Sequence, residues 1–259
     1  IMNGLKSFKI DGKNVKEIVG THNIYNDIIG LILINKEGIA HRIEISNIIS
    51  INNWIPVDEE IVSMIPISNE NEKIIVLSEL NKIRMFGVNQ ISKANSNVGK
   101  VRCAIKYDNM SPELILLSKS GRYHCMKIDE IPELSKNSVG ILVNLPDEPV
   151  SMCLADLRNE DSFLTTIVND NETYIMRFDT NEFEITNRSN KGRLLASLDD
   201  GYIFGKINKV NLRDKESKCS LIGRYSTSQI SVTNLRTCES GIDTKKVPVE
   251  TMGILQYVI

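Results

Sequence analysis

The sequence lacks the residue patterns that usually identify an enzyme or a metal site. Its three histidines, His22, His41 and His124, lie too far apart for an HExxH-type ligand spacing. It contains no GxSxG, P-loop or GxGxxG sequence. Adjacent carboxylates such as Glu59 and Glu60 would point to opposite faces of a strand, which suits a turn better than an acid–base pair. These absences argue against catalysis by this chain on its own and against a bound metal.

Cysteine pairs and long apolar runs are also missing. The five cysteines are scattered without a CxxC pair, which favours reduced, buried thiols over a disulfide framework. No uncharged run approaches the roughly 20 residues of a membrane-spanning helix, and no basic segment followed by an apolar one opens the chain. We therefore expect a cytoplasmic protein with no signal peptide and no membrane segment.

Neither charge sign dominates the composition. The chain is 41% hydrophobic and 25% charged, as in ordinary soluble proteins, and its net charge is −2. A basic excess is the usual mark of a nucleic-acid-binding protein, so this balance argues weakly against one. Binding needs only one basic face, however, and the positions of the lysines and arginines decide more than their sum.

Long helical periodicity is missing as well, and short strand-like runs replace it. The apolar run Leu114–Leu117 is followed by a turn ending at Gly121, which can adopt the positive φ of a tight hairpin. A second extended run, Arg122–Ile128, follows, then a polar loop over 129–140 and a returning run, Ile141–Leu145. β-branched runs between such turns predict strands.

This hairpin, loop and returning strand recur along the chain. The turns of successive repeats are separated by 40 to 57 residues and lie at Gly38, Asn81, Gly121, Asn171 and Ser228. Four strands every 40–50 residues indicate a β-propeller. We expect an all-β chain of about five four-stranded blades, or six if residues 1–26 form more of a blade. The expected divisions are N-terminal strands that close the ring at 1–27, and blades near 28–70, 71–110, 111–158, 159–214 and 215–259.

The third repeat carries a recurring set of residues. It contains Ser118-Lys-Ser-Gly121, Lys127, Asp129-Glu-Ile-Pro132 and Lys136-Asn-Ser-Val-Gly140. The other repeats contain parts of the same order. The first has Lys36-Glu-Gly38 and Arg42, and the second has Arg84, Phe86, Lys93 and Val98-Gly-Lys100. The fourth has Arg177, Phe178 and Arg188-Ser-Asn-Lys-Gly-Arg193. Over residues 28–258 this order resembles the C-terminal domain of the A-type subunits of the type IIA DNA topoisomerases, DNA gyrase and topoisomerase IV.

The resemblance implies a β-pinwheel, in which adjacent blades exchange strands. It implies non-sequence-specific binding of double-stranded DNA, which bends or wraps around the basic rim. The domain itself would need no cofactor, because the catalytic tyrosine, the ATP site and the Mg²⁺ site would lie elsewhere in the parent enzyme. The implied partners are the breakage-reunion domain of the same polypeptide and a separate ATPase subunit, in the cytoplasm at the nucleoid.

One feature of the gyrase family is missing, its heptapeptide box Gln-Arg-Arg-Gly-Gly-Lys-Gly. The corresponding loop, Ser46–Trp54, is neutral and apolar. This difference favours a protein of the topoisomerase IV type or a divergent paralogue, and puts gyrase-like chiral wrapping in doubt. Trp54 suits a core or interface anchor better than a base-stacking role.

Basic residues in equivalent loops would neutralise phosphates along a curved edge. The loop candidates are Lys93, Lys100, Arg102, Lys136, Arg188, Lys191 and Arg193, the hairpin candidates are Arg84, Lys127 and Arg177, and the last repeat adds Lys245 and Lys246. Amides near Gly99, Gly140 and Gly192 could also approach phosphate. Two alternatives stay open. The rim cations could be ordinary solvated surface on a protein-interaction propeller, or carboxylates from several blades could meet at the axis, as in a hydrolase.

Overall fold

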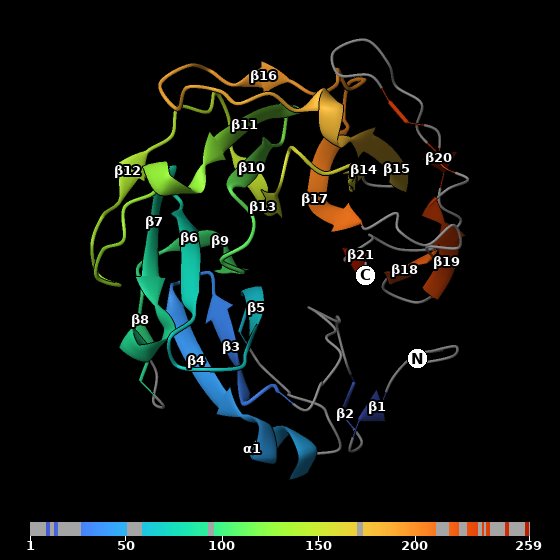
Figure 1. Cartoon of the computed structure of the whole chain (residues 1–259). Helices are drawn as coiled ribbons and strands as arrows, with labels where there is room; N and C mark the ends of the chain where they lie inside the picture. The colour runs from blue at the N-terminus through green and yellow to red at the C-terminus, as the bar shows by residue number, and fades with distance from the viewer. Residues whose placement is uncertain are drawn as a thin grey trace.

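Antiparallel sheets succeed one another around a central axis in the computed structural model of the chain (Figure 1). The structure describes residues 9–10, 13–14, 27–50, 59–92, 96–169, 173–210, 218–222, 227–232, 235, 237–238, 247–248 and 257–258. The expected all-β pinwheel is confirmed. The described residues form four four-stranded blades and a fifth sheet of three strands, so one fewer complete four-stranded blade is present than the five expected.

Each blade consists of a hairpin, an inner strand and a short outer strand. Blade one contains β5 (Ile61–Ile67), β3 (Gly30–Asn35), β4 (Ile39–Glu44) and β8 (Ser96–Asn97), in that order. Blade two contains β9 (Val101–Tyr107), β6 (Lys73–Ser78), β7 (Lys82–Gly87) and β12 (Ile141–Leu142). Blade three contains β13 (Pro149–Ala155), β10 (Glu113–Ser118), β11 (Arg122–Lys127) and β16 (Arg193–Leu194).

The last blades follow the same plan. Blade four contains β17 (Ile203–Val210), β14 (Ser162–Val168), β15 (Thr173–Asp179) and β20 (Val247–Pro248). The fifth sheet contains β19 (Thr227–Ser231), β18 (Lys218–Ile222) and β21 (Tyr257–Val258). Outside the blades, β1 (Lys9–Ile10) pairs with β2 (Lys13–Asn14), and α1 (Ile45–Ser50) follows β4.

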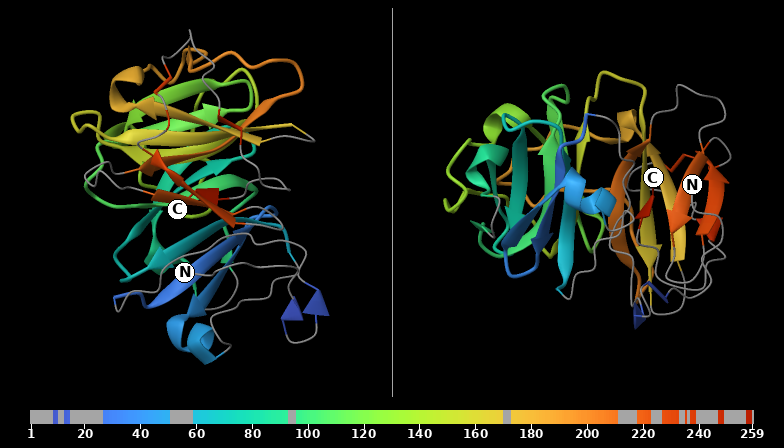
Figure 2. Two further views of the ribbon diagram at one scale, coloured as in Figure 1. Left: turned by 90° about the vertical axis from the view of Figure 1, so that its right-hand side faces the viewer. Right: turned by 90° about the horizontal axis from the view of Figure 1, so that it is seen from below.

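The apolar runs of the hairpins are explained by burial of both faces of a blade. Successive side chains of a strand point to opposite faces. In β6, Ile74 and Val76 therefore pack with blade one, and Ile75 and Leu77 pack with blade three. All four are fully buried. The core consists of three buried clusters, one between each pair of neighbouring blades from one to four, and side views show sheets stacked face to face (Figure 2).

Strand exchange between blades, which the family resemblance implied, is present. The outer strand β12 comes from the segment that follows β11 in blade three, yet it pairs with β7 of blade two. In the same way β8 pairs with β4, β16 with β11, and β20 with β15. Each exchanged strand ties a blade to its predecessor through backbone hydrogen bonds between segments far apart in sequence.

The hairpin turns match the sequence prediction in three repeats. Gly38 and Gly121 have φ of 83° and 84°, and Asn81 has φ of 55°. In the last repeat the prediction was wrong, because Ser228 pairs with Leu221 inside the β18–β19 ladder. The expected turn at Asn171, the loop around Trp54 and most of the expected ring closure by residues 1–27 lie outside the described residues. The helix α1 was not expected; it begins directly after β4.

Candidate nucleic-acid interface

Five of the seven predicted loop cations lie on the segments that carry the exchanged strands over the outer edge. We call these segments crossings. The first crossing covers residues 88–100, the second covers 128–148, and the third covers 180–202. Each follows the hairpin of one blade, supplies the outer strand of the preceding blade, and returns to the next inner strand. Lys100 therefore lies in the first crossing, Lys136 in the second, and Arg188, Lys191 and Arg193 in the third. The outer strands β8, β12 and β16 that these crossings supply lie along the outer edge of the ring (Figure 1).

The backbone at Lys136 is held on both sides. Its N–H donates to Oε1 of Gln90 at 2.8 Å, and its carbonyl oxygen accepts from Nη2 of Arg84 at 2.9 Å. The Lys136 side chain is half-buried, and it forms no ion pair with any residue that the structure describes. Its ammonium group is therefore available to an external anion.

The third crossing is hydrogen-bonded to the second. The Asn144 N–H donates to the Arg188 carbonyl at 2.9 Å, and Nδ2 of Asn144 donates to the Ser189 carbonyl at 2.9 Å. Nη1 of Arg188 donates to the Leu142 carbonyl at 3.2 Å, and the other donors of this guanidinium have no hydrogen-bond partner among the residues that the structure describes. Lys191 is exposed and has no ionic partner within the described part of the chain. The two crossings thus present their cations from a shared hydrogen-bonded edge.

Three other predicted loop cations are paired with carboxylates. Lys100 lies 3.6 Å from Glu37, and Arg193 forms an ion pair with Glu184. Arg102, in β9, forms one with Glu148, which also pairs with Lys119. The hydrogen bond from Lys119, together with the charges of Arg102 and Lys119, holds the pKa of Glu148 below its usual value. These cations can contact phosphate only in competition with their carboxylates.

Two of the predicted hairpin cations face inward. Arg84 is 3% exposed and donates to the carbonyls of Val98 and Lys136, and its burial lowers its pKa. Arg177 is likewise largely covered. It donates to the Val232 and Leu235 carbonyls at 3.4 and 3.3 Å and pairs with Asp179 at 3.0 Å. Lys127, at the end of β11, is exposed. Lys93, Lys245 and Lys246 lie outside the described residues.

The loop glycines are not equivalent to one another. Gly140 and Gly192 have φ of 81° and 71°, and each directly precedes an outer strand and lies against a backbone carbonyl of the preceding blade. Gly99 instead follows its outer strand, lies in open space and donates its N–H to Asn97 at 2.7 Å. Only the glycines with close neighbours are needed for packing.

Sequence reasoning missed the uncharged side chains that hold the crossings. His124 is fully buried in β11. Its Nδ1 lies 2.8 Å from Oγ1 of Thr186, and its Nε2 lies 3.0 Å from the carbonyl oxygens of both Asn144 and Asn190. A polar side chain in the middle of an otherwise apolar strand is the signal that could have identified it. Gln90 and Asn144 carry no comparable signal, because both lie in polar loops.

The ends of the hairpins opposite their turns are acidic. These ends comprise 68–72, 108–112 and 156–161, with the first residues of the second and third crossings, 128–133 and 180–182. Together they contain 10 carboxylates and a single cation, Arg158, which itself pairs with Asp156 at 2.8 Å. A phosphate backbone is repelled from such a face. The later part of the second and third crossings, from Lys136 and Arg188 onward, is therefore the surface on which a polyanion could bind.

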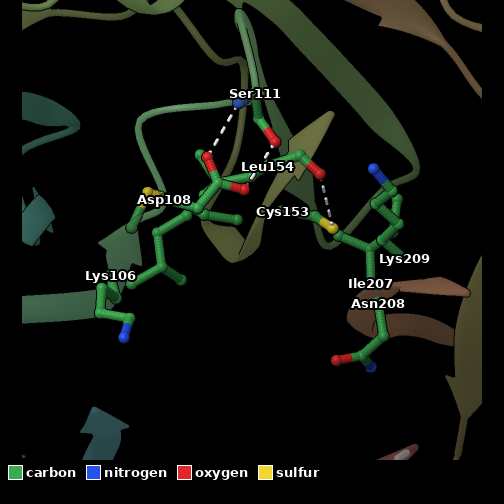
Figure 3. Close-up of a pocket in the computed structure, with 10 residues that line it drawn as sticks. Lys106, Asp108, Ser111, Cys153, Leu154, Ile207, Asn208 and Lys209 are labelled. Carbon is green, nitrogen blue, oxygen red and sulfur yellow. Dashed lines mark hydrogen bonds between the residues drawn. The ribbon is translucent and has the colours of Figure 1, made fainter. Parts of the chain in front are cut away.

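The ring axis offers little for chemistry. A hollow of about 410 Å³ lies between β9, β13 and β17, with Lys106, Asp108 and Lys209 at its edge (Figure 3). Lys106 pairs with Glu72 at 3.1 Å and Lys209 with Asp161 at 2.7 Å. Within the described ranges no three His, Cys, Asp or Glu side chains are grouped as metal ligands would be. The alternative of a hydrolase with clustered axial carboxylates gains no support.

The cysteines behave as core residues. Cys103, Cys125, Cys153 and Cys238 are buried thiols, and burial raises the pKa of the first three to about 12. No helix among the described residues has the length and apolar character needed to span a membrane.

Comparison with known proteins gives structural matches only. No protein-family profile and no curated protein sequence matches the chain. Among solved structures, a DNA gyrase A C-terminal domain matches with a TM-score of 0.59 and 16% identity, covering 77% of this chain and 69% of that one. A DNA topoisomerase IV C-terminal domain matches with a TM-score of 0.65 and 17% identity, covering 90% and 79%. The E. coli ParC C-terminal domain matches with a TM-score of 0.56 and 9% identity, covering 89% and 97%. The chain therefore has the β-pinwheel fold of the C-terminal domains of DNA gyrase A and topoisomerase IV.

Proposed function

We propose that this chain is the DNA-binding and DNA-bending C-terminal domain of the A-type subunit of a bacterial-type type IIA topoisomerase. The observation that carries the proposal is the set of available cations on successive crossings of one rim, Lys136 in the second and Arg188 and Lys191 in the third. The matched solved structures are C-terminal domains of this class of enzyme.

Binding on this rim is electrostatic and independent of base sequence. Cations that neutralise phosphates release condensed counterions from the duplex, which provides the affinity. Equivalent loops at the edge of successive blades follow a curve, so a duplex that contacts several of them must bend. Contacts to phosphate fix the path of the DNA and carry no sequence information.

The contact residues fall into two groups. Lys136, Arg188 and Lys191 bind phosphate directly. Lys127 is exposed but lies at the acidic end of its hairpin, opposite Glu113 in the strand register, so it contributes little. Lys100, Arg102 and Arg193 join them by exchanging a carboxylate for a phosphate. Lys93, Lys245 and Lys246 belong to the same proposed set by their sequence positions. Arg84 and Arg177 are excluded from it, because their guanidinium groups are buried against backbone carbonyls.

The domain has no catalytic role of its own in this proposal. The DNA-cleaving tyrosine and the sites for ATP and Mg²⁺ belong to other parts of the parent enzyme, which comprises a breakage-reunion domain in the same polypeptide and a separate ATPase subunit. The enzyme would work on cytoplasmic, nucleoid DNA. The missing gyrase box favours a topoisomerase IV type or a divergent paralogue over gyrase itself.

A protein-interaction module without DNA binding is the second candidate. The ion pairs of Lys100, Arg102 and Arg193 and the net charge of −2 favour it, because they reduce the positive potential of the rim. This candidate predicts no DNA binding even at low salt.

Duplex binding measured by fluorescence anisotropy over a range of salt concentrations separates the two candidates. With about five phosphates engaged, log K should fall with log[salt] at a slope near −4.5, equally for unrelated sequences. Faster ring closure of short linear DNA in the presence of the protein would report bending. If no binding is detected at about 25 mM salt, where such contacts are strongest, the DNA-binding proposal is wrong.

A further inference from the structure

We infer that Arg84 and His124 are positioning residues for the rim, which fix the backbone of the cation-bearing crossings in consecutive blades without touching DNA. The inference rests on the proposed function, and it names the side chains that make the rim competent to bind. Each residue is the third after its hairpin turn residue, Asn81 or Gly121.

In blade two, Arg84 joins two crossings. Its Nη2 donates to the Val98 carbonyl in the first crossing and to the Lys136 carbonyl in the second, the latter at 2.9 Å. Gln90 accepts the Lys136 N–H from the other side at 2.8 Å. The carbonyl of Lys136 is thus held by Arg84 in blade two, and its N–H is held by Gln90 in the first crossing. The Lys136 side chain therefore extends from a backbone position that hydrogen bonds hold in place.

In blade three, His124 makes the corresponding links. Its Nε2 lies 3.0 Å from the Asn144 carbonyl in the second crossing and 3.0 Å from the Asn190 carbonyl in the third. Because a carbonyl oxygen can only accept, Nε2 carries the hydrogen and donates to both. Thr186 lies 2.8 Å from Nδ1. Asn190 directly precedes Lys191, so the imidazole fixes the backbone that presents this cation.

Fixing these loops before DNA arrives improves binding. A loop that is ordered only on binding costs conformational entropy at that step, whereas a preorganised loop has already lost it on folding. Arg84 and His124 therefore raise DNA affinity through Lys136 and Lys191, and their effect requires those lysines to be present. This dependence distinguishes a positioning role from general stabilisation of the fold.

A double-mutant cycle tests this dependence. Gln90→Leu removes the acceptor of the Lys136 N–H with little change in volume, and Arg84→Met removes the donor to its carbonyl; each is paired with Lys136→Ala. In blade three, His124→Leu is paired with Lys191→Ala. Each positioning variant should weaken duplex binding by about fivefold in the otherwise unchanged chain, and by less than about twofold when the corresponding lysine is already alanine.

Amide hydrogen exchange supplies a second readout and covers variants that lose stability. The Lys136 amide should lose protection in Gln90→Leu, while amides in the β6–β7 ladder keep theirs. Met110→Ala, an exposed change at the acidic end of the hairpins, serves as the control and should leave both readouts unchanged.

The outcomes separate the two proposals. If the unchanged chain binds no duplex, the proposed function and this inference both fall. If it binds, but Gln90→Leu, Arg84→Met and His124→Leu cause the same loss with and without the rim lysines, the inference is overturned and DNA binding stands.

Discussion

Gly140 packs so closely against Ile83 that a Cβ atom at Gly140 would lie 2.5 Å from the Ile83 carbonyl oxygen. Gly140 directly precedes the exchanged strand β12, and its φ is 81°. The contact therefore lies where the second crossing is joined to blade two. The same arrangement recurs in the third crossing, where a Cβ at Gly192 would lie 2.6 Å from the Tyr123 carbonyl oxygen. Close approach of backbone to backbone lets one blade supply the edge of another.

Replacement of Gly140 should therefore cost more than backbone strain alone. Gly140→Ala should lower the free energy of unfolding by more than about 2 kcal/mol, because a positive φ costs an alanine about 1 kcal/mol and the clash adds to it. Gly201 is the matched control, since its φ is 85° and a Cβ added there would meet nothing within 4 Å. Urea denaturation of both variants gives the comparison. Equal losses would show that the Ile83 contact contributes nothing.

Neutralising the carboxylates that pair with rim cations should strengthen DNA binding. Glu184→Gln releases Arg193, and Glu37→Gln releases Lys100. Exposed pairs of this kind are worth up to about 1 kcal/mol, so each change should raise duplex affinity about two- to fivefold at low salt. Glu160→Gln changes the net charge equally on the acidic face and is the control. If Glu160→Gln raises the affinity as much, the effect is one of net charge and the rim pairs are not in competition with phosphate.

Removing an available rim cation should change the salt dependence of binding. Lys136→Ala and Lys191→Ala should each make the slope of log K against log[salt] shallower by about 1, with a similar loss on all duplex sequences. Anisotropy titrations at several salt concentrations measure this slope. Lys209→Ala, which removes a lysine paired with Asp161 beside the axial hollow, should leave it unchanged. An unchanged slope in both rim variants would remove these lysines from the proposed interface.

Arg177 should matter for stability. Arg177→Met leaves the carbonyls of Val232 and Leu235 without their donor and breaks the pair with Asp179. Loss of partners for buried polar groups should lower the free energy of unfolding by about 2 kcal/mol. Lys127→Met, an exposed change on the neighbouring hairpin, should stay within about 0.5 kcal/mol. Similar values for the two variants would contradict the structural role of Arg177.

The network around Glu148 should make stability depend on pH under acidic conditions. Because its pKa is lower in the folded than in the unfolded chain, the stabilisation is complete above the ordinary glutamate pKa of about 4.3 and is lost as the pH falls through the folded value. Its size should be about 0.5–1 kcal/mol, as for other partly exposed pairs. The stability difference between the unchanged chain and Glu148→Gln should therefore shrink between about pH 6 and pH 3. A difference that stays constant over this range would exclude the ion pairs as its source.

Local features of the sequence predicted most of the strands. The runs Leu114–Leu117 and Arg122–Ile128 correspond closely to β10 and β11, because each run is bounded by turn or loop signals. Gly38, Asn81 and Gly121 were recognisable as turns by their tolerance of positive φ. The Ser228 turn was placed wrongly because Ser, Thr and Gln in that segment suit a strand and a turn equally well.

The role of a charged residue was much harder to predict. Local sequence does not distinguish the roles of Arg84 and Lys136. Arg84 lies shortly after a hairpin turn, and Lys136 lies in a polar loop. Their exposure differs because Arg84 points between two crossings that fold back over β7, whereas the Lys136 side chain has no such cover. The pairing of Arg102 with Glu148 likewise joins residues from different repeats. Such neighbours are determined by packing, and no local pattern encodes them.

The amino-acid sequence by itself determined the all-β repeat, its hairpins, and which segments are apolar enough to be buried, because these depend on side-chain period and turn chemistry within a few residues. Only the tertiary structure decided that each outer strand belongs to the preceding blade, and which cations remain available on the rim. Both depend on hydrogen bonds and ion pairs between segments some tens of residues apart, which form only when the blades close around their axis.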